Sequence, residues 1–132
     1  MQQVNISTKK REELVDITGP IQDVLKKNKW QNGQILVYCT HTTAGVTINE
    51  SADPSVASDL IGKLRELIPE RDKYSHMEGN SDAHIKSSLT GCSEQLIVQN
   101  GDIVLGTWQG VFFAEFDGPR SRKVYLQFIC SE

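Results

Sequence analysis

The chain has 132 residues, with 14 Lys and Arg against 17 Asp and Glu, so its formal net charge is −3. This length suits one domain with a buried core, and we expect a single domain over residues 1–132. The charge balance provides no basic face of the kind that DNA or RNA binding requires, so a nucleic-acid partner is not expected.

Membrane and disulfide signals are also lacking in the sequence. No apolar run approaches the roughly 18 residues of a membrane span, and MQQVNISTKKREEL has no apolar signal core. We therefore expect a soluble, cytoplasmic protein without a membrane partner. Cys39, Cys92 and Cys130 form no CxxC pair and are odd in number, which favours three buried, reduced thiols over disulfides or a cysteine zinc site.

The first half of the chain predicts strands around one helix. Apolar residues alternate at 2–8 and 12–17, and a helix is expected over 18–30, with Thr18 as cap and Pro20 in its first turn. Asn32-Gly33 predicts a type I′ turn into a strand over 34–41. The segment HTTAGVTINE, residues 41–50, also alternates as a half-buried strand does.

A second and stronger helix is predicted over 52–69, with Asp53 as cap and Pro54 at its first position. Residues 69–82 are polar and unpatterned, and long loops in compact domains are often functional. Two helical turns follow, ended by Gly91.

The last third predicts β-strands. The segments 94–99, 102–109, 111–117 and 122–130 are separated by short turns, including Asn100-Gly101. We therefore expect an α+β domain with a largely antiparallel sheet, in sandwich or barrel form, and two main helices.

The three histidines are candidate metal ligands. His41, His76 and His84 fall at element ends or in the long loop, where side chains can converge on a cleft. Three neutral imidazoles with one water form a catalytic zinc pattern. Three separate surface or capping histidines are the alternative, and residue spacing does not choose between them.

Two carboxylates are candidate acid–base groups. Asp82 lies two residues before His84, and Glu115 lies in VFFAEFD, a strand with apolar residues on both faces. A buried carboxylate must be paired, so Glu115 faces either solvent on a one-sided sheet or a polar site. The apolar residues on both faces favour the polar site, where Glu115 would orient a histidine or act as a base.

Arginines and one tryptophan are candidate substrate-binding residues. Arg120, Ser121 and Arg122 lie in DGPRSRK, where guanidinium groups and a hydroxyl suit a phosphate, although a solvated hairpin tip would have the same composition. Trp108, in GTWQG, could stack on a heterocycle, but an aromatic residue in a strand more commonly packs in the core.

Together these motifs resemble the YjbQ family. SEQLIVQNGDIVLGTWQGV is similar to its signature, and HTTAGVTINE, HMEGNSDAHIKSSL and DGPRSRKV are similar to its other blocks, in order over nearly the full length. The resemblance implies an α+β homotrimer in which His41, His76 and His84 hold a divalent metal such as zinc.

The family resemblance also implies a weak thiamine phosphate synthase activity, in which a pyrimidine pyrophosphate is joined to a thiazole phosphate. We therefore expect a metal-dependent enzyme that acts on a small phosphorylated metabolite, with Arg122, Ser121 and Arg120 gripping phosphate. A metal-dependent phosphoester hydrolase and a non-catalytic metabolite- or metal-binding module are the alternatives.

Overall fold

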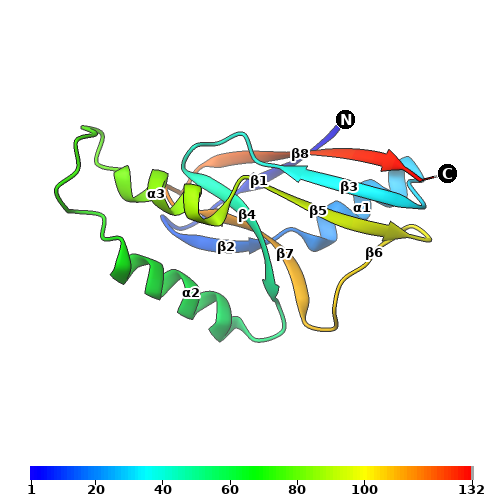
Figure 1. Cartoon of the computed structure of the whole chain (residues 1–132), viewed down its shortest axis with the longest axis horizontal. Coiled ribbons are helices and arrows are strands. Elements are labelled where there is room, and N and C mark those ends of the chain that lie inside the picture. Colours follow the sequence, from blue (N-terminus) through cyan, green and yellow to red (C-terminus); the bar gives the residue numbers. More distant parts are fainter. Residues whose placement is uncertain (132) are drawn as a thin grey trace.

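The computed structural model describes residues 1–131, which form two antiparallel sheets and three helices (Figure 1). The five-stranded sheet has the order β1 (Gln2–Ser7), β8 (Ser121–Cys130), β3 (Gly33–Tyr38), β5 (Ser93–Gln99) and β6 (Asp102–Ile103). The three-stranded sheet has the order β2 (Glu13–Asp16), β7 (Gln109–Glu115) and β4 (Ala44–Glu50). The expected α+β class with largely antiparallel sheets is confirmed.

The helices are α1 (Thr18–Asn28), α2 (Pro54–Leu67) and α3 (Ser81–Thr90). Helices α2 and α3 lie together at one end of the molecule, joined by the long loop, whereas the chain termini lie at the other end (Figure 1). None of these helices is long and apolar enough to span a lipid bilayer.

Strand β7 is the middle strand of the three-stranded sheet and is buried on both faces. Val111 and Phe113 pack into the main core with side chains of the five-stranded sheet. Ala114, with Phe116 just after the strand, packs against Ile61 of α2 and Ala83 of α3 in a smaller cluster. The expectation that both faces of this segment are apolar is confirmed.

The helix starts differ from one another in how they are capped. Asp53 caps α2 as predicted, since its carboxylate accepts a hydrogen bond from the Ser55 N–H at 2.9 Å. The predicted Thr18 cap of α1 is wrong: Ile17 occupies the cap position. The Thr18 hydroxyl instead accepts a hydrogen bond from the Val111 N–H at 2.8 Å, so it joins the helix to β7.

The two Asn-Gly pairs behave differently. The turn predicted at Asn100-Gly101 is confirmed: the two residues have φ values of 52° and 82°, the positive values that a type I′ turn requires. The turn predicted at Asn32-Gly33 is wrong, because Gly33 is already the first residue of β3. A Cβ at Gly33 would lie 2.1 Å from the Ile129 carbonyl oxygen, so close approach of β8 requires the glycine.

Two further predictions are corrected. The strand expected over 102–109 ends at Ile103, and the Gly106 N–H bonds to the Gln109 side chain at 2.8 Å rather than to a neighbouring strand. The cysteines are free, but only Cys39 is buried, whereas Cys92 and Cys130 are exposed. Both exposed cysteines lie at strand ends, where the core does not cover them.

Candidate functional site

A polar pocket of about 370 Å³ lies where the β3–β4 connection, the start of α3 and the β7–β8 turn meet. This volume suits a small metabolite. We call it the histidine pocket, and its lining consists of Thr40, His41, Thr42, Thr43, Glu78, Asn80, His84, Asp117, Arg120 and Arg122. Four of the predicted site residues, His41, His84, Arg120 and Arg122, therefore come together from three distant parts of the chain.

His84 lies near both of the other histidines. The rings of His76 and His84 are edge to face with centroids 5.2 Å apart, and His84 and His41 line the same pocket. Within residues 1–131, no three His, Cys, Asp or Glu side chains form a metal-binding group as placed. A shared metal ion therefore requires rotation of these side chains, which the exposed position of His76 allows.

His41 is partly buried, and β8 fixes its ring. Its Nε2 accepts a hydrogen bond from the Lys123 N–H at 3.1 Å, so a neutral His41 carries its proton on Nδ1. Burial and the positive charge of Arg122 lower the pKa of His41. As placed, His41 is a neutral hydrogen-bond donor, and coordination of a metal by Nε2 requires release of the Lys123 amide.

Glu115 lies fully buried behind the pocket, where Arg122 neutralises it. Both of its carboxylate oxygens accept hydrogen bonds from Arg122, one of them also bonds to the Thr8 hydroxyl at 2.8 Å, and the other to the Asp117 N–H at 3.1 Å. Burial raises the pKa of Glu115, but the hydrogen bonds from Arg122, Thr8 and Asp117 outweigh burial and lower it. Glu115 is therefore an ionised group that positions Arg122.

Arg122 and Arg120 each keep part of their guanidinium for a ligand. Arg122 donates to Glu115 and to the Thr43 hydroxyl through Nε and one Nη, and Arg120 donates to Asp117 in the same way. Among residues 1–131, the second Nη of each arginine makes no hydrogen bond. These two donors belong to side chains that line the pocket.

Asn80 brings an unpaired acceptor to the pocket. Its amide N–H donates to Asp117 at 2.9 Å, but its buried Oδ1 has no hydrogen-bond partner among the described residues. A buried polar atom without a partner is unusual in a native structure. Asn80 lines the pocket, so a small movement that uncovers this oxygen would let a cation or a donor group on a ligand satisfy it.

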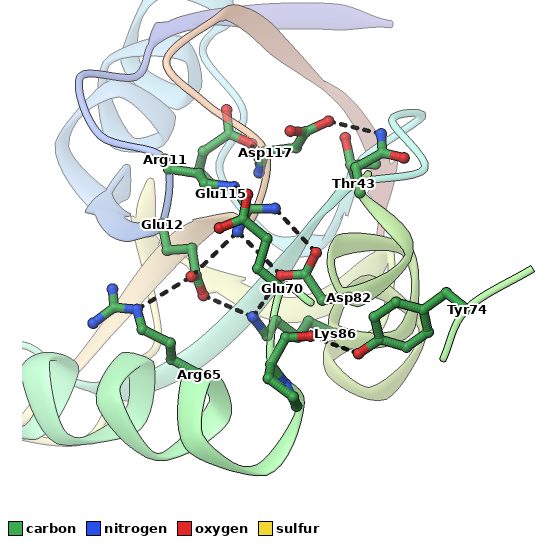
Figure 2. Close-up of polar contacts among 12 residues, drawn as sticks. Arg11, Glu12, Thr43, Arg65, Glu70, Tyr74, Asp82, Lys86, Glu115 and Asp117 are labelled. Atoms are coloured by element: carbon green, nitrogen blue, oxygen red, sulfur yellow. Dashed lines mark hydrogen bonds and ion pairs between the residues drawn. The ribbon is translucent and has the colours of Figure 1, made fainter. Parts of the chain in front are cut away.

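Asp82 does not join the histidines, because residues two apart on a helix point to nearly opposite sides. Its carboxylate bonds to Arg11 at 3.0 and 3.1 Å and to the fully buried Lys86 at 2.9 Å. Figure 2 shows Lys86 between Asp82 and Glu12, and these three side chains form a buried ion cluster. Arg11 and the exposed Arg65 bond to its carboxylates from the edge. Burial raises the pKa of Asp82, but bonds from Arg11 and Lys86 outweigh burial and lower it.

Two other predicted site residues lie apart from the histidine pocket. Trp108 is 62% exposed, so it packs neither in the core nor along the pocket. Ser121 is exposed and opposite Ser7, on the face of β8 that points away from Arg120 and Arg122.

Sequence reasoning missed several residues that shape the site. Thr8 and Thr43 hold Glu115 and Arg122, and Asn80 supplies the unpaired oxygen. The only signal for Thr43 was its place in the segment that begins with His41. Nothing in the residues around Thr8 connects it to a partner more than 100 positions away.

Comparison with known proteins identifies the family. The family described as UPF0047 protein YjbQ-like matches residues 2–131. The chain belongs to the YjbQ family. UPF0047 protein MJ1081 of Methanocaldococcus jannaschii is 57% identical over 124 residues, covering 94% of this chain and 90% of the relative. UPF0047 protein YugU of Bacillus subtilis is 48% identical over 127 residues, covering 96% of both chains.

Solved structures of similar proteins have the same fold. A conserved protein of the family from Clostridium acetobutylicum is 45% identical with a TM-score of 0.95, covering 98% of this chain and 100% of that one. The conserved hypothetical protein TT1486 of Thermus thermophilus is 42% identical with a TM-score of 0.92 and the same coverage. Both are described as uncharacterised or hypothetical, and a shared fold does not by itself fix a function.

The ion pair behind the pocket predicts a pH-dependent stability effect. Glu115→Gln leaves Arg122 buried without its counter-charge and should reduce the free energy of unfolding by about 3 kcal/mol near pH 7. The lowered pKa of Glu115 means that its contribution is present above its ordinary value of 4.5 and is lost as pH falls through the lowered value. The native protein and the variant should therefore differ less in their free energy of unfolding, measured with urea, as the pH falls below 4.5.

Glu66→Gln is the matched control, because Glu66 is exposed on α2 in a surface pair with Lys63 and should change stability by less than about 1 kcal/mol. An equal effect of the two substitutions would contradict the role of the buried pair.

Proposed function

We propose that the histidine pocket binds a small phosphorylated metabolite together with a divalent metal, and that this YjbQ-family protein is an enzyme acting on that metabolite. The observation that carries the proposal is the convergence of His41, His84, Arg120 and Arg122 on one polar pocket. Guanidinium and imidazole N–H groups are the donors that suit phosphate oxygens.

The arginines of the pocket are already paired with carboxylates, so a bound phosphate would need a further positive charge. Arg122 is paired with Glu115 and Arg120 with Asp117, so neither arginine brings a fully uncompensated positive charge. Glu78 adds a further carboxylate to the lining. Near pH 7 a phosphate monoester is close to a dianion, and its binding here needs additional positive charge. A divalent cation would supply that charge.

The donors that would hold the metal are the imidazoles of His41, His76 and His84, which suit Zn²⁺. The contact between His76 and His84, the shared lining of His84 and His41, and the unpaired Asn80 oxygen fit this group of ligands. When bound, the metal would polarise a phosphate or pyrophosphate oxygen as a Lewis acid.

The protein side chains would have separate tasks in this proposal. Arg122 and Arg120 would bind the phosphate through their unused Nη groups, and His41 would bind the metal through Nε2 once the Lys123 amide is released. Glu115 would act as a positioning residue for Arg122. Asp82 would position His84 indirectly, because it anchors α3 to Arg11.

The reaction that the family resemblance suggests is a weak thiamine phosphate synthase activity. In that reaction a pyrimidine pyrophosphate couples to a thiazole phosphate and releases pyrophosphate. Both substrates carry phosphate groups, which suits a pocket with two arginines. Product analysis distinguishes this transfer from phosphoester hydrolysis, which would release phosphate without a coupled product. Ligand-induced thermal stabilisation without any turnover would instead indicate a binding module.

Metal content is the first test. Protein prepared without a histidine tag should contain about one transition metal ion per chain by elemental analysis, and His84→Ala should reduce that content at least about tenfold. Ile85→Ala, on the exposed side of the same helix, is the matched control and should keep its metal. Native protein that takes up no added Zn²⁺ would contradict the metal site.

Phosphate binding is the second test. Arg120→Ala should weaken the binding of inorganic phosphate by about 10- to 100-fold in calorimetry on Zn²⁺-loaded protein, because a charged hydrogen bond is lost. Lys27→Ala, which removes an exposed positive charge on α1, should leave phosphate affinity unchanged. Equal affinity of the metal-free and metal-loaded forms would contradict the charge argument.

We also propose a homotrimer, as the family resemblance implies. Several apolar side chains on the outer face of the five-stranded sheet support an assembly, since Tyr38, Ile97 and Ile129 are 42%, 63% and 50% exposed. Sedimentation equilibrium should give three times the chain mass of 14.8 kDa, and a single-chain mass would contradict the proposal.

A further inference from the structure

Two of the three cysteines lie opposite one another at the end of a strand pair. Cys39 directly follows β3, and Cys92 directly precedes β5. The antiparallel register of these strands pairs Tyr38 with Ser93, so the next step of the ladder places Cys39 opposite Cys92. The Cys39 N–H donates to the Cys92 carbonyl at 2.7 Å, which confirms that the backbones are still adjacent at this step.

The geometry of this position suits a disulfide. Opposite residues in a hydrogen-bonded antiparallel pair have Cα atoms about 5.5 Å apart, within the usual range that disulfides span. Side chains of opposite residues also project from the same face of the sheet. Both cysteines line a pocket of about 600 Å³, which shares Thr40, His41, Thr42 and His84 with the histidine pocket. We call it the cysteine pocket.

The two thiols differ in accessibility, and this sets an order of reaction. Cys92 is exposed and can meet a small oxidant in solution, whereas Cys39 is only 2% exposed. Cys39 is therefore shielded from an oxidant in solution, but it lies next to a mixed disulfide that forms at Cys92.

We propose that Cys39 and Cys92 are a modification site, at which exchange with a low-molecular-weight disulfide such as oxidised glutathione forms a reversible disulfide. The Cys92 thiol loses its proton to solvent and attacks one sulfur of the small disulfide. The sulfur–sulfur bond breaks, a mixed disulfide forms at Cys92, and one small thiolate leaves.

The second step closes the bridge. The Cys39 thiol loses its proton, its sulfur attacks the Cys92 sulfur of the mixed disulfide, and the second small thiolate leaves. Two protein thiols have then been oxidised by two electrons, and one small disulfide has been reduced to two thiols. The bridge would join the chain just before His41 to the chain just after α3, along the wall common to both pockets. The inference requires neither the proposed metal nor the phosphate.

The test uses the full chain with Cys130→Ser, because Cys130 is exposed and lies opposite Gly33 at the far end of β3. After incubation with oxidised glutathione, free thiols in denaturant should fall from two per chain to none. The intact mass should fall by two hydrogens, without a glutathione adduct, and a reductant should restore both thiols. A mixed disulfide that persists at Cys92, or a disulfide between chains on non-reducing electrophoresis, would overturn the proposal.

Two further variants in this background assign the order of the steps. Cys39→Ser should accumulate one stable glutathione adduct, because the resolving thiol is absent. Cys92→Ser should remain unmodified, because the buried Cys39 thiol does not meet the oxidant. An adduct on Cys39 in the second variant would contradict the order. If Cys39→Ser does not fold, peptide mapping of Cys130→Ser protein after short incubation should find the first adduct on Cys92.

Discussion

A carboxylate that is removed from water must be neutralised by the groups around it, and Glu115 at the end of β7 is in this position. Its partners come from three parts of the chain: Thr8 after β1, Arg122 in β8 and the Asp117 amide in the turn between β7 and β8. Glu115 belongs to the three-stranded sheet and Arg122 to the five-stranded sheet. The ion pair therefore joins the two sheets at the edge of the histidine pocket, and it holds the arginine in one orientation.

The buried ion cluster makes a similar connection at the other side of α3. Lys86 is fully buried between Asp82 and Glu12, and Arg11 and Arg65 complete the charges (Figure 2). Such clusters contribute little net stability, but loss of one member leaves an uncompensated charge. The rotation of α3 about its axis is therefore restricted. Since His84 lies on the opposite side of this helix, the same restriction directs it toward the histidine pocket.

Much of the fold could be predicted from local patterns. The cap of α2, the turn at Asn100-Gly101 and the end of α3 at Gly91 are set by residues within a few positions. Predictions failed where a distant segment decided the outcome. Strand β7 uses the hydroxyl that would have capped α1, and the approach of β8 explains Gly33.

The site was predictable to a similar extent. A charged residue in a strand that is apolar on both faces indicated that Glu115 needed a partner, and that partner is Arg122. The helical period could have shown that Asp82 and His84 point apart, had the helix been predicted to begin at Ser81. The involvement of Thr8, Thr43 and Asn80 depends on contacts between distant segments, for which the sequence has no local signal.

The position of β8 within its sheet has a consequence for how the chain folds during synthesis. β8 comes last in the chain, yet it lies between β1 and β3 and pairs with both. Until β8 leaves the ribosome, β1 has no partner in this sheet, and the edge of β3 that faces β8 is open. Pairing of the first strand with the last is also a contact of high sequence separation, which slows folding. Exposed strand edges favour aggregation, so the open edges of β1 and β3 can pair wrongly until β8 emerges.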